Sequence, residues 1–198
     1  IFEKNADNAQ LNYLGSAPNN HPRNENRKTR DDHRVSKTLT DMLRANAVNI
    51  DWRITVYAEL SGLGDFNGMQ NGLTSSQAAS FNGNGIKNTS KVGEYFTKPE
   101  APGMLMSCAE LKFILAEAAL KGYITGSPIT AEMYYKAGIF ISYDQFGTDL
   151  VDLAEYYFGA GFTSTDELAN DFYLNDSWAW DPAKAMELIG TQRWVASF

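Results

Sequence analysis

Two glutamates on one predicted helix face are the first residues of this sequence whose type and spacing suggest chemistry. Glu110 and Glu117 are seven residues apart, which places both carboxylates on the same side of a helix. Paired carboxylates serve as acid and base in glycoside hydrolysis, but they normally lie on different elements that flank a cleft. The favoured interpretation is that both belong to the solvated stripe of a buried helix, so we predict no catalytic residue and no enzyme.

The sequence contains no recognisable motif for binding a metal ion or a cofactor. His21 and His33, with Asp31 and Asp32, match no zinc-ligand spacing and lie in a segment that reads as loop. Cys108 is the only cysteine, so a cysteine-rich metal site and an intrachain disulfide are both excluded. The sequence contains no phosphate-binding loop, no dinucleotide glycine motif after a strand and no serine nucleophile elbow. We predict no metal and no cofactor.

A glycine- and asparagine-rich segment over residues 60–103 is the most unusual stretch of the chain. It holds eight of the sixteen glycines and reads as a long loop, a kind of segment that is often functional. Aromatic residues are spaced through it, namely Phe66, Phe81, Tyr95 and Phe96. These rings could form a platform on which sugars stack, or each ring could instead pin the loop to the core.

Composition and charge restrict the class of protein. The 198 residues are 43% hydrophobic and 21% charged, as in a globular chain with a sizeable core. No apolar run reaches the roughly 20 residues that span a bilayer. The net charge of −7 is uneven: residues 1–100 carry +1 and residues 101–198 carry −8. Such an acidic half argues against nucleic-acid binding, which needs cations to displace phosphate counterions.

The first hundred residues are predicted to hold little regular structure. Residues 1–35 read as loop, and the run from Arg27 to Arg34 reads as a salt-bridged, solvated surface because its charges are of mixed sign. Ser36 is a good N-cap for a following helix. Alternation around Trp52 predicts a short strand.

Helices are predicted from Met104 onward. The helix Met104–Lys121 is apolar except for a polar stripe that includes Ser107, so it should be buried on several sides. A second helix, Ala131–Gln145, follows Thr130, and its Ala137-Gly138 pair would allow a close approach. Such a pair of helices is typical of tetratricopeptide-like repeats. Shorter helices are predicted at 150–158, after Ser164 or Thr165, and from Asp181 at the Asp-Pro start signal.

Four segments resemble, in their order, the SusD/RagB family of surface glycan-binding lipoproteins. The stretch Met104–Ile124 is similar to the family's signature helix. The segment Arg34–Leu39 resembles the one before the family's "DPRL…YA" stretch, which here reads Asp51-Trp-Arg-Ile-Thr-Val-Tyr-Ala58, with Trp52 where proline is usual. Tyr134–Ile139 with Ser142 resembles the "YxxGIxxS" helix, and Ile189–Trp194 resembles a C-terminal "I-x-x-Q-[KR]-W" helix.

The resemblance implies a mainly α fold with tetratricopeptide-like helical pairs, long irregular loops and little strand. Residues 1–198 would form part of a single SusD-like domain, with 60–103 as a loop region and 104–198 as the helical portion. It also implies placement at the extracellular face of the outer membrane and partnership with a SusC-like TonB-dependent transporter. Family members are longer, so we expect that the N-terminal lipid anchor and the C-terminal arginine-rich segment lie outside this chain.

The predicted function is non-catalytic glycan binding that delivers nutrient to the transporter. The predicted sugar contacts are residues of the glycine- and asparagine-rich loop, where aromatic faces stack on pyranose rings and amides bond hydroxyls in both directions. They are Phe66, Asn67, Asn71, Phe81 and Tyr95. The alternative, favoured by the paired helices, is a protein-interaction scaffold with no small-molecule ligand.

Overall fold

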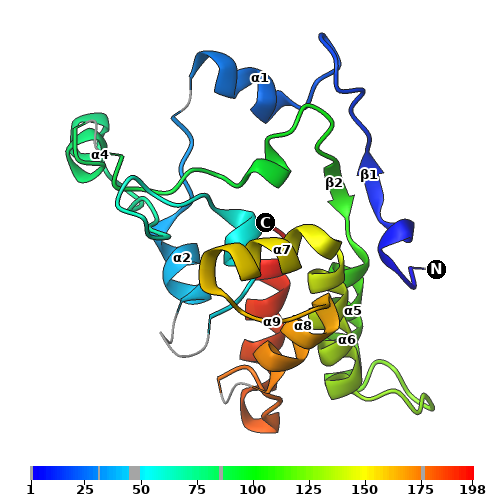
Figure 1. Cartoon of the computed structure of the whole chain (residues 1–198). Helices are drawn as coiled ribbons and strands as arrows, with labels where there is room; N and C mark the ends of the chain where they lie inside the picture. The colour runs from blue at the N-terminus through cyan, green and yellow to red at the C-terminus, as the bar shows by residue number, and fades with distance from the viewer. Residues whose placement is uncertain (1, 31, 45–49, 85–86, 175–176) are drawn as a thin grey trace. The chain divides into compact units, whose positions relative to one another are not determined.

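The computed structural model describes residues 2–30, 32–44, 50–84, 87–174 and 177–198. The chain forms two compact units: unit 1 combines residues 1–11 with 104–198, and unit 2 consists of residues 12–103. Helices are the main regular structure, and among the described residues the only sheet pairs two short strands, β1 (Ala9–Leu11) and β2 (Gly103–Met106) (Figure 1). The predicted fold class, mainly α with little strand, is confirmed.

Unit 1 is built around four helices: α5 packs against both α6 and α9, and α6 also packs against α8. The elements of this unit in chain order are the 3-10 turn η1 (Asn5–Asp7), β1, β2, α5 (Cys108–Leu120), α6 (Ala131–Asp144), α7 (Gly147–Phe158), α8 (Thr165–Tyr173), the 3-10 turn η3 (Pro182–Lys184) and α9 (Ala185–Ala196). The fully buried side chains of the unit come from all of the α-helices in this set.

The helix predicted from Met104 begins four residues later than expected. Met104 and its neighbours form β2, and α5 starts at Cys108 after Ser107, whose hydroxyl accepts a hydrogen bond from the Glu110 amide at 3.0 Å. Ser107 is therefore the N-cap of α5 rather than a member of its polar stripe. An apolar run does not by itself distinguish a strand from a helix, which is why the start was misplaced.

The predicted close approach of two helices occurs between α5 and α6. Phe113 of α5 is fully buried, and a Cβ placed on Gly138 of α6 would lie 2.7 Å from the Phe113 ring. Cys108 is also fully buried, and burial raises the pKa of its thiol, as expected of a small core residue.

Local end signals set most of the later helix boundaries. Thr130 and Ser164 accept hydrogen bonds from the first turns of α6 and α8. Gly159 ends α7 in the left-handed conformation, with φ of 60°. The Asp181-Pro182 signal starts the 3-10 turn η3, and α9 follows directly from it.

Unit 2 contains more helix than the sequence predicted. Its elements are α1 (Pro22–Thr29), α2 (Lys37–Leu43), α3 (Ile54–Tyr57), α4 (Ser75–Phe81) and the 3-10 turn η2 (Glu94–Phe96). Ser36 caps α2 as predicted. The loop predicted over residues 1–35 is wrong where α1 forms, and the strand predicted near Trp52 is wrong because the chain there turns into α3.

The strand prediction failed because both sides of the segment are buried. Alternation predicts a strand only if the polar residues face solvent, whereas Arg53 and Thr55 are 0% and 3% exposed. Arg53 is held by Asp51, whose carboxylate accepts hydrogen bonds from the Arg53 backbone amide at 3.1 Å and from its Nε at 2.9 Å. This bonding satisfies the buried guanidinium and shapes the turn that leads into α3.

Candidate ligand-binding site

The loop predicted to bind sugar, residues 60–103, contains the helix α4. Thr74 and Gln77 form a capping box, in which the Thr74 hydroxyl accepts from the Gln77 amide and the Gln77 side chain accepts from the Thr74 amide. The Thr-x-x-Gln spacing is a signal for a helix start that the sequence analysis missed. Phe81 is the last residue of this helix and is 38% exposed.

The other predicted sugar-binding residues lie against different partners. Phe66 is 3% exposed, which favours the pinning alternative for this ring. Asn67 is exposed, but its backbone is fixed by Ser90, whose hydroxyl accepts from the Asn67 amide at 2.9 Å. The exposed amide of Asn71 lies 3.5 Å from the Thr38 hydroxyl. Tyr95 is half-buried with its ring centroid 5.1 Å from that of Phe96.

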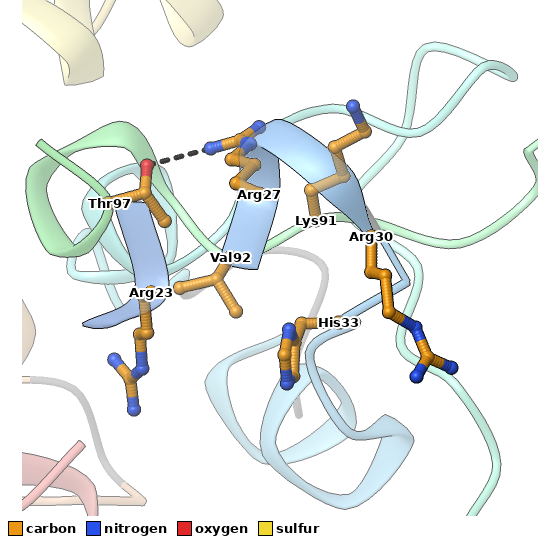
Figure 2. A pocket seen from close by; sticks show the side chains of 7 residues that line it. All are labelled: Arg23, Arg27, Arg30, His33, Lys91, Val92 and Thr97. Atoms are coloured by element: carbon orange, nitrogen blue, oxygen red, sulfur yellow. Dashed lines mark hydrogen bonds between the residues drawn. The ribbon is translucent and has the colours of Figure 1, made fainter. Parts of the chain in front are cut away.

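A second site, which the sequence analysis did not predict, is a pocket lined mainly by cations within unit 2. We call it the arginine pocket and define it by Arg23, Arg27, Arg30, His33, Lys91, Val92 and Thr97 (Figure 2). It encloses about 280 Å³, including space open to solvent.

Helix α1 carries Arg23 and Arg27, and Arg30 follows the helix as its C-cap. Arg23 and Arg27 are four residues apart and lie on one face of the helix, whereas Arg30 has left the helical conformation, with φ of −141° and ψ of 84°. His21 is the N-cap, and its Nδ1 accepts from the Arg23 amide at 3.1 Å. Burial, and secondarily the charge of Arg23, lower the pKa of His21, so near neutral pH its ring is the uncharged acceptor that this cap requires.

Arg27 joins the pocket to the rest of unit 2. One of its guanidinium nitrogens donates to the Thr97 hydroxyl at 2.7 Å, and the other lies 2.5 Å from the Glu59 carboxylate. Figure 2 shows the Arg27 guanidinium directed at Thr97, on the opposite side of the pocket from the guanidiniums of Arg23 and Arg30. Arg27 is therefore engaged in holding the pocket together.

The pocket keeps an excess of positive charge. Arg30 lies 3.3 Å from the Asp32 carboxylate, and His33 lies 3.9 Å from the same side chain. Among the described residues, no carboxylate lies within ion-pair distance of Arg23. Arg23 and Arg27 are four residues apart on α1, and like charges at this spacing repel each other.

The two glutamates that suggested acid–base chemistry each pair with a cation. Glu117 lies 2.5 Å from Lys121 on the same helix, which lowers the pKa of its carboxyl. Glu110 lies 3.2 Å from Arg193 of α9. These pairs match the interpretation of both residues as scaffold rather than as a catalytic pair.

Within the described ranges, no group of three or more histidine, cysteine, aspartate or glutamate side chains is arranged to hold a metal ion. No helix in those ranges combines the length and apolar character needed to cross a bilayer.

Comparison with known proteins defines the class to which this fold belongs. The chain matches, over residues 1–198, the family model described as SusD-like, starch-binding associating with outer membrane, and it therefore belongs to the SusD-like family. The resemblance seen in the four motifs is thereby confirmed. No curated protein matches the sequence.

Solved structures of the same fold come from several bacteria. A Bacteroides vulgatus outer membrane protein linked to nutrient binding aligns with a TM-score of 0.77 at 21% identity, covering 100% of this chain and 44% of that one. A SusD homologue from Bacteroides fragilis aligns with a TM-score of 0.75 at 25% identity, covering 100% and 43%. A chitin-binding SusD homologue from Flavobacterium johnsoniae aligns with a TM-score of 0.67 at 23% identity, covering 100% and 40%. The chain thus spans less than half the length of these relatives.

Proposed function

We propose that this protein binds glycans at the extracellular face of the outer membrane and passes them to a TonB-dependent transporter without cleaving them. The observation that carries the proposal is the match of the whole chain to a family described by starch binding and outer-membrane association. One structural relative is described as chitin-binding, which shows that the fold can serve glycan capture in that protein.

Within the chain, the proposed sugar contacts are the accessible members of the predicted set. The amides of Asn67 and Asn71 reach solvent and can both donate to and accept from sugar hydroxyls. The exposed ring of Phe81 and the half-buried ring of Tyr95 offer stacking surfaces. Phe66 would support the loop from the core.

The absence of catalysis is part of the proposal. The ion pairs of Glu110 and Glu117 support it, because each carboxylate is already committed to a cation rather than facing its counterpart across a cleft. Incubating the protein with the bound glycan should therefore yield no shortened product by chromatography.

The test is affinity electrophoresis of the full chain through gels that contain starch, chitin oligosaccharides or other neutral glycans. Retardation by at least one glycan is expected, and Phe81→Ala should weaken it. Phe158→Ala is the matched control, because Phe158 of unit 1 is similarly exposed, at 41%, and lies outside the predicted loop. If no glycan slows the protein, the proposed ligand class is wrong.

The alternative function is a helical scaffold for protein partners. The packing of α5 against α6 favours it, as does the exposure of Tyr123 and Met133 at 78% and 53% on and beside that pair. Affinity purification from membranes separates the two: recovery of a large outer-membrane barrel supports the transporter partnership. Recovery of soluble proteins alone, together with no glycan binding, would favour the scaffold.

A further inference from the structure

We propose that the exposed face of helix α7 is a docking surface for a segment of a partner protein that is rich in arginine and lysine. We call it the acidic tyrosine face and define it by Asp149, Asp152, Glu155 and Tyr156, all of which are exposed. The proposal goes beyond glycan binding, because it concerns a surface of unit 1 and does not require a sugar at the same place.

A tyrosine ring in solvent is the starting observation. Tyr156 is 80% exposed, the highest value among the large apolar and aromatic side chains that are exposed in the described part of the chain. Helix α7 buries Leu150 and Ala154, so its opposite side faces outward. Asp149, Asp152 and Tyr156 are spaced by three and four residues and therefore share that outward side. Tyrosine is among the residues that dominate the affinity of protein interfaces.

The end of α7 fixes the position of this ring. Gly159 ends the helix in the left-handed conformation, and the Glu155 carboxylate accepts a hydrogen bond from the Gly161 amide at 2.7 Å. The rings of Tyr156 and Tyr157 meet edge to face, with centroids 5.0 Å apart and planes at 71°. Rings at this angle do not form one flat platform for a sugar chain, so the surface favours a protein segment over a glycan.

The charge around the acidic tyrosine face specifies a cationic partner. Residues 137–183 contain nine aspartate and glutamate residues and no lysine, arginine or histidine. This stretch includes all of α7 and α8, two helices that pack against each other (Figure 1). The resulting field attracts cations, and arginine suits the surface best because its guanidinium both pairs with carboxylates and stacks on an aromatic ring.

The experiment measures the binding of a fluorescent peptide of alternating arginine and glycine to the full chain by fluorescence anisotropy. A matched peptide with citrulline in place of every arginine keeps the size and removes the charge. We expect the arginine peptide to bind at least about tenfold more tightly at low salt, with the difference shrinking as salt rises. Equal affinity for the two peptides would refute the proposal.

Variants of α7 then assign the binding to this face. Asp149→Asn/Asp152→Asn should weaken binding of the arginine peptide by about tenfold, because two of the attracting charges are lost. Tyr156→Ala should weaken it by about fivefold, whereas Tyr156→Phe should keep most of the affinity because the ring remains. If none of these variants binds the peptide more weakly than the unmodified protein, the assignment to α7 is wrong.

Two matched controls separate this face from general effects of charge and exposure. Glu25→Gln/Asp41→Asn changes the net charge equally, but on unit 2, where each carboxylate pairs with a lysine. Tyr123→Ala removes a ring that is 78% exposed and lies outside residues 137–183. Both controls should bind the arginine peptide almost as tightly as the unmodified protein. Losses in the controls equal to those of the α7 variants would overturn the proposal.

Further outcomes distinguish a protein partner from a sugar and from the proposed function. A glucosamine oligomer is compared with its N-acetylated counterpart; if only the glucosamine oligomer binds through Tyr156 and the arginine peptide does not, the occupant is an amino sugar and the protein partner is refuted. Weaker peptide binding by Asp149→Asn/Asp152→Asn with unchanged retardation by glycans supports the proposal. Peptide binding at α7 by a protein that no glycan retards supports it too, and refutes the proposed function alone. Unchanged thermal unfolding of the variants confirms that folded proteins are being compared.

Discussion

The buried pair Asp51–Arg53 yields the sharpest prediction for stability. The Arg53 side chain is 0% exposed and the Asp51 side chain 4%, with Nη2 of Arg53 2.5 Å from the carboxylate. Replacing Arg53 by Met removes the cation and leaves a carboxylate in the core. Breaking a buried pair in this way costs about 3–5 kcal/mol, because the Asp51 carboxylate loses the Arg53 guanidinium without regaining water. We expect Arg53→Met to lower the free energy of unfolding by this amount.

A double-mutant cycle distinguishes the pair from simple loss of packing. Asp51→Asn keeps a side-chain oxygen that can accept from the Arg53 backbone amide, as Oδ1 does at 3.1 Å, but removes the charge. In Arg53→Met/Asp51→Asn no charge is left buried, so the loss should be smaller than the sum of the two single losses by about 1 kcal/mol or more. Urea unfolding followed by tryptophan fluorescence and by circular dichroism gives the four free energies.

The matched control is an arginine–aspartate pair at the surface of the same unit. Arg44 lies 2.8 Å from Asp65, with side chains 42% and 47% exposed. Arg44→Met should cost no more than about 1 kcal/mol, because water already solvates both charges. The reasoning fails if Arg53→Met and Arg44→Met are equally destabilising, or if the double variant is as unstable as simple addition predicts.

Three further predictions, with four substitutions, test other parts of the structure. Gly138→Ala places a methyl group against Phe113 and should destabilise the protein by about 1–3 kcal/mol. Gly190→Ala, whose Cβ meets nothing within 4 Å, should stabilise the protein by up to about 1 kcal/mol. Chemical denaturation of both variants compares the two effects. The pKa of His21 is lowered in the folded state, so the unfolded state binds more protons as pH falls through the ordinary value of 6.5, and stability decreases there. His21→Asn keeps an N-cap and should abolish this decrease in thermal melts. Hydrogen bonds from the Thr163 amide and hydroxyl lower the pKa of Glu167. The stability that the Glu167 carboxylate contributes is therefore present above the ordinary pKa of 4.5 and is lost as pH falls below it. Acid unfolding of Glu167→Gln should lack this loss of stability.

Local chemistry explains which parts of the fold were predictable from sequence. The caps at Ser36, Thr130 and Ser164 depend on a hydroxyl and an amide three residues away, so the sequence contains the whole interaction. The sequence predicts that another helix approaches closely at Gly138, because small residues on a helix face indicate a close neighbour. Its partner ring could not be named, because that contact depends on tertiary packing.

The missed elements share a different cause. Helix α1 carries no buried residue, so it lacks the apolar periodicity by which helices are usually detected. Strand β2 consists of Gly103 followed by three apolar residues, a pattern that fits the first turn of the next helix equally well. In both cases the hydrophobic pattern, on which sequence interpretation mainly depends, carried no information about the local conformation.

The arginine pocket could not be predicted from the sequence because its lining residues come from distant segments of the chain. Its walls come from segments as far apart as Arg27 and Thr97, 70 residues from one another, and hydrogen bonds from Arg27 and Asn24 to Thr97 join them. In the sequence, Arg27 to Arg34 is a run in which acidic and basic residues are mixed over a short distance. In the structure, α1 places Arg23 and Arg27 on one face and Arg30 follows as the C-cap, while Glu59 pairs with Arg27 and Asp32 pairs with Arg30. A net charge of −7 for the chain therefore does not describe every part of its surface, because folding brings together cations that are spread among acids in the linear sequence.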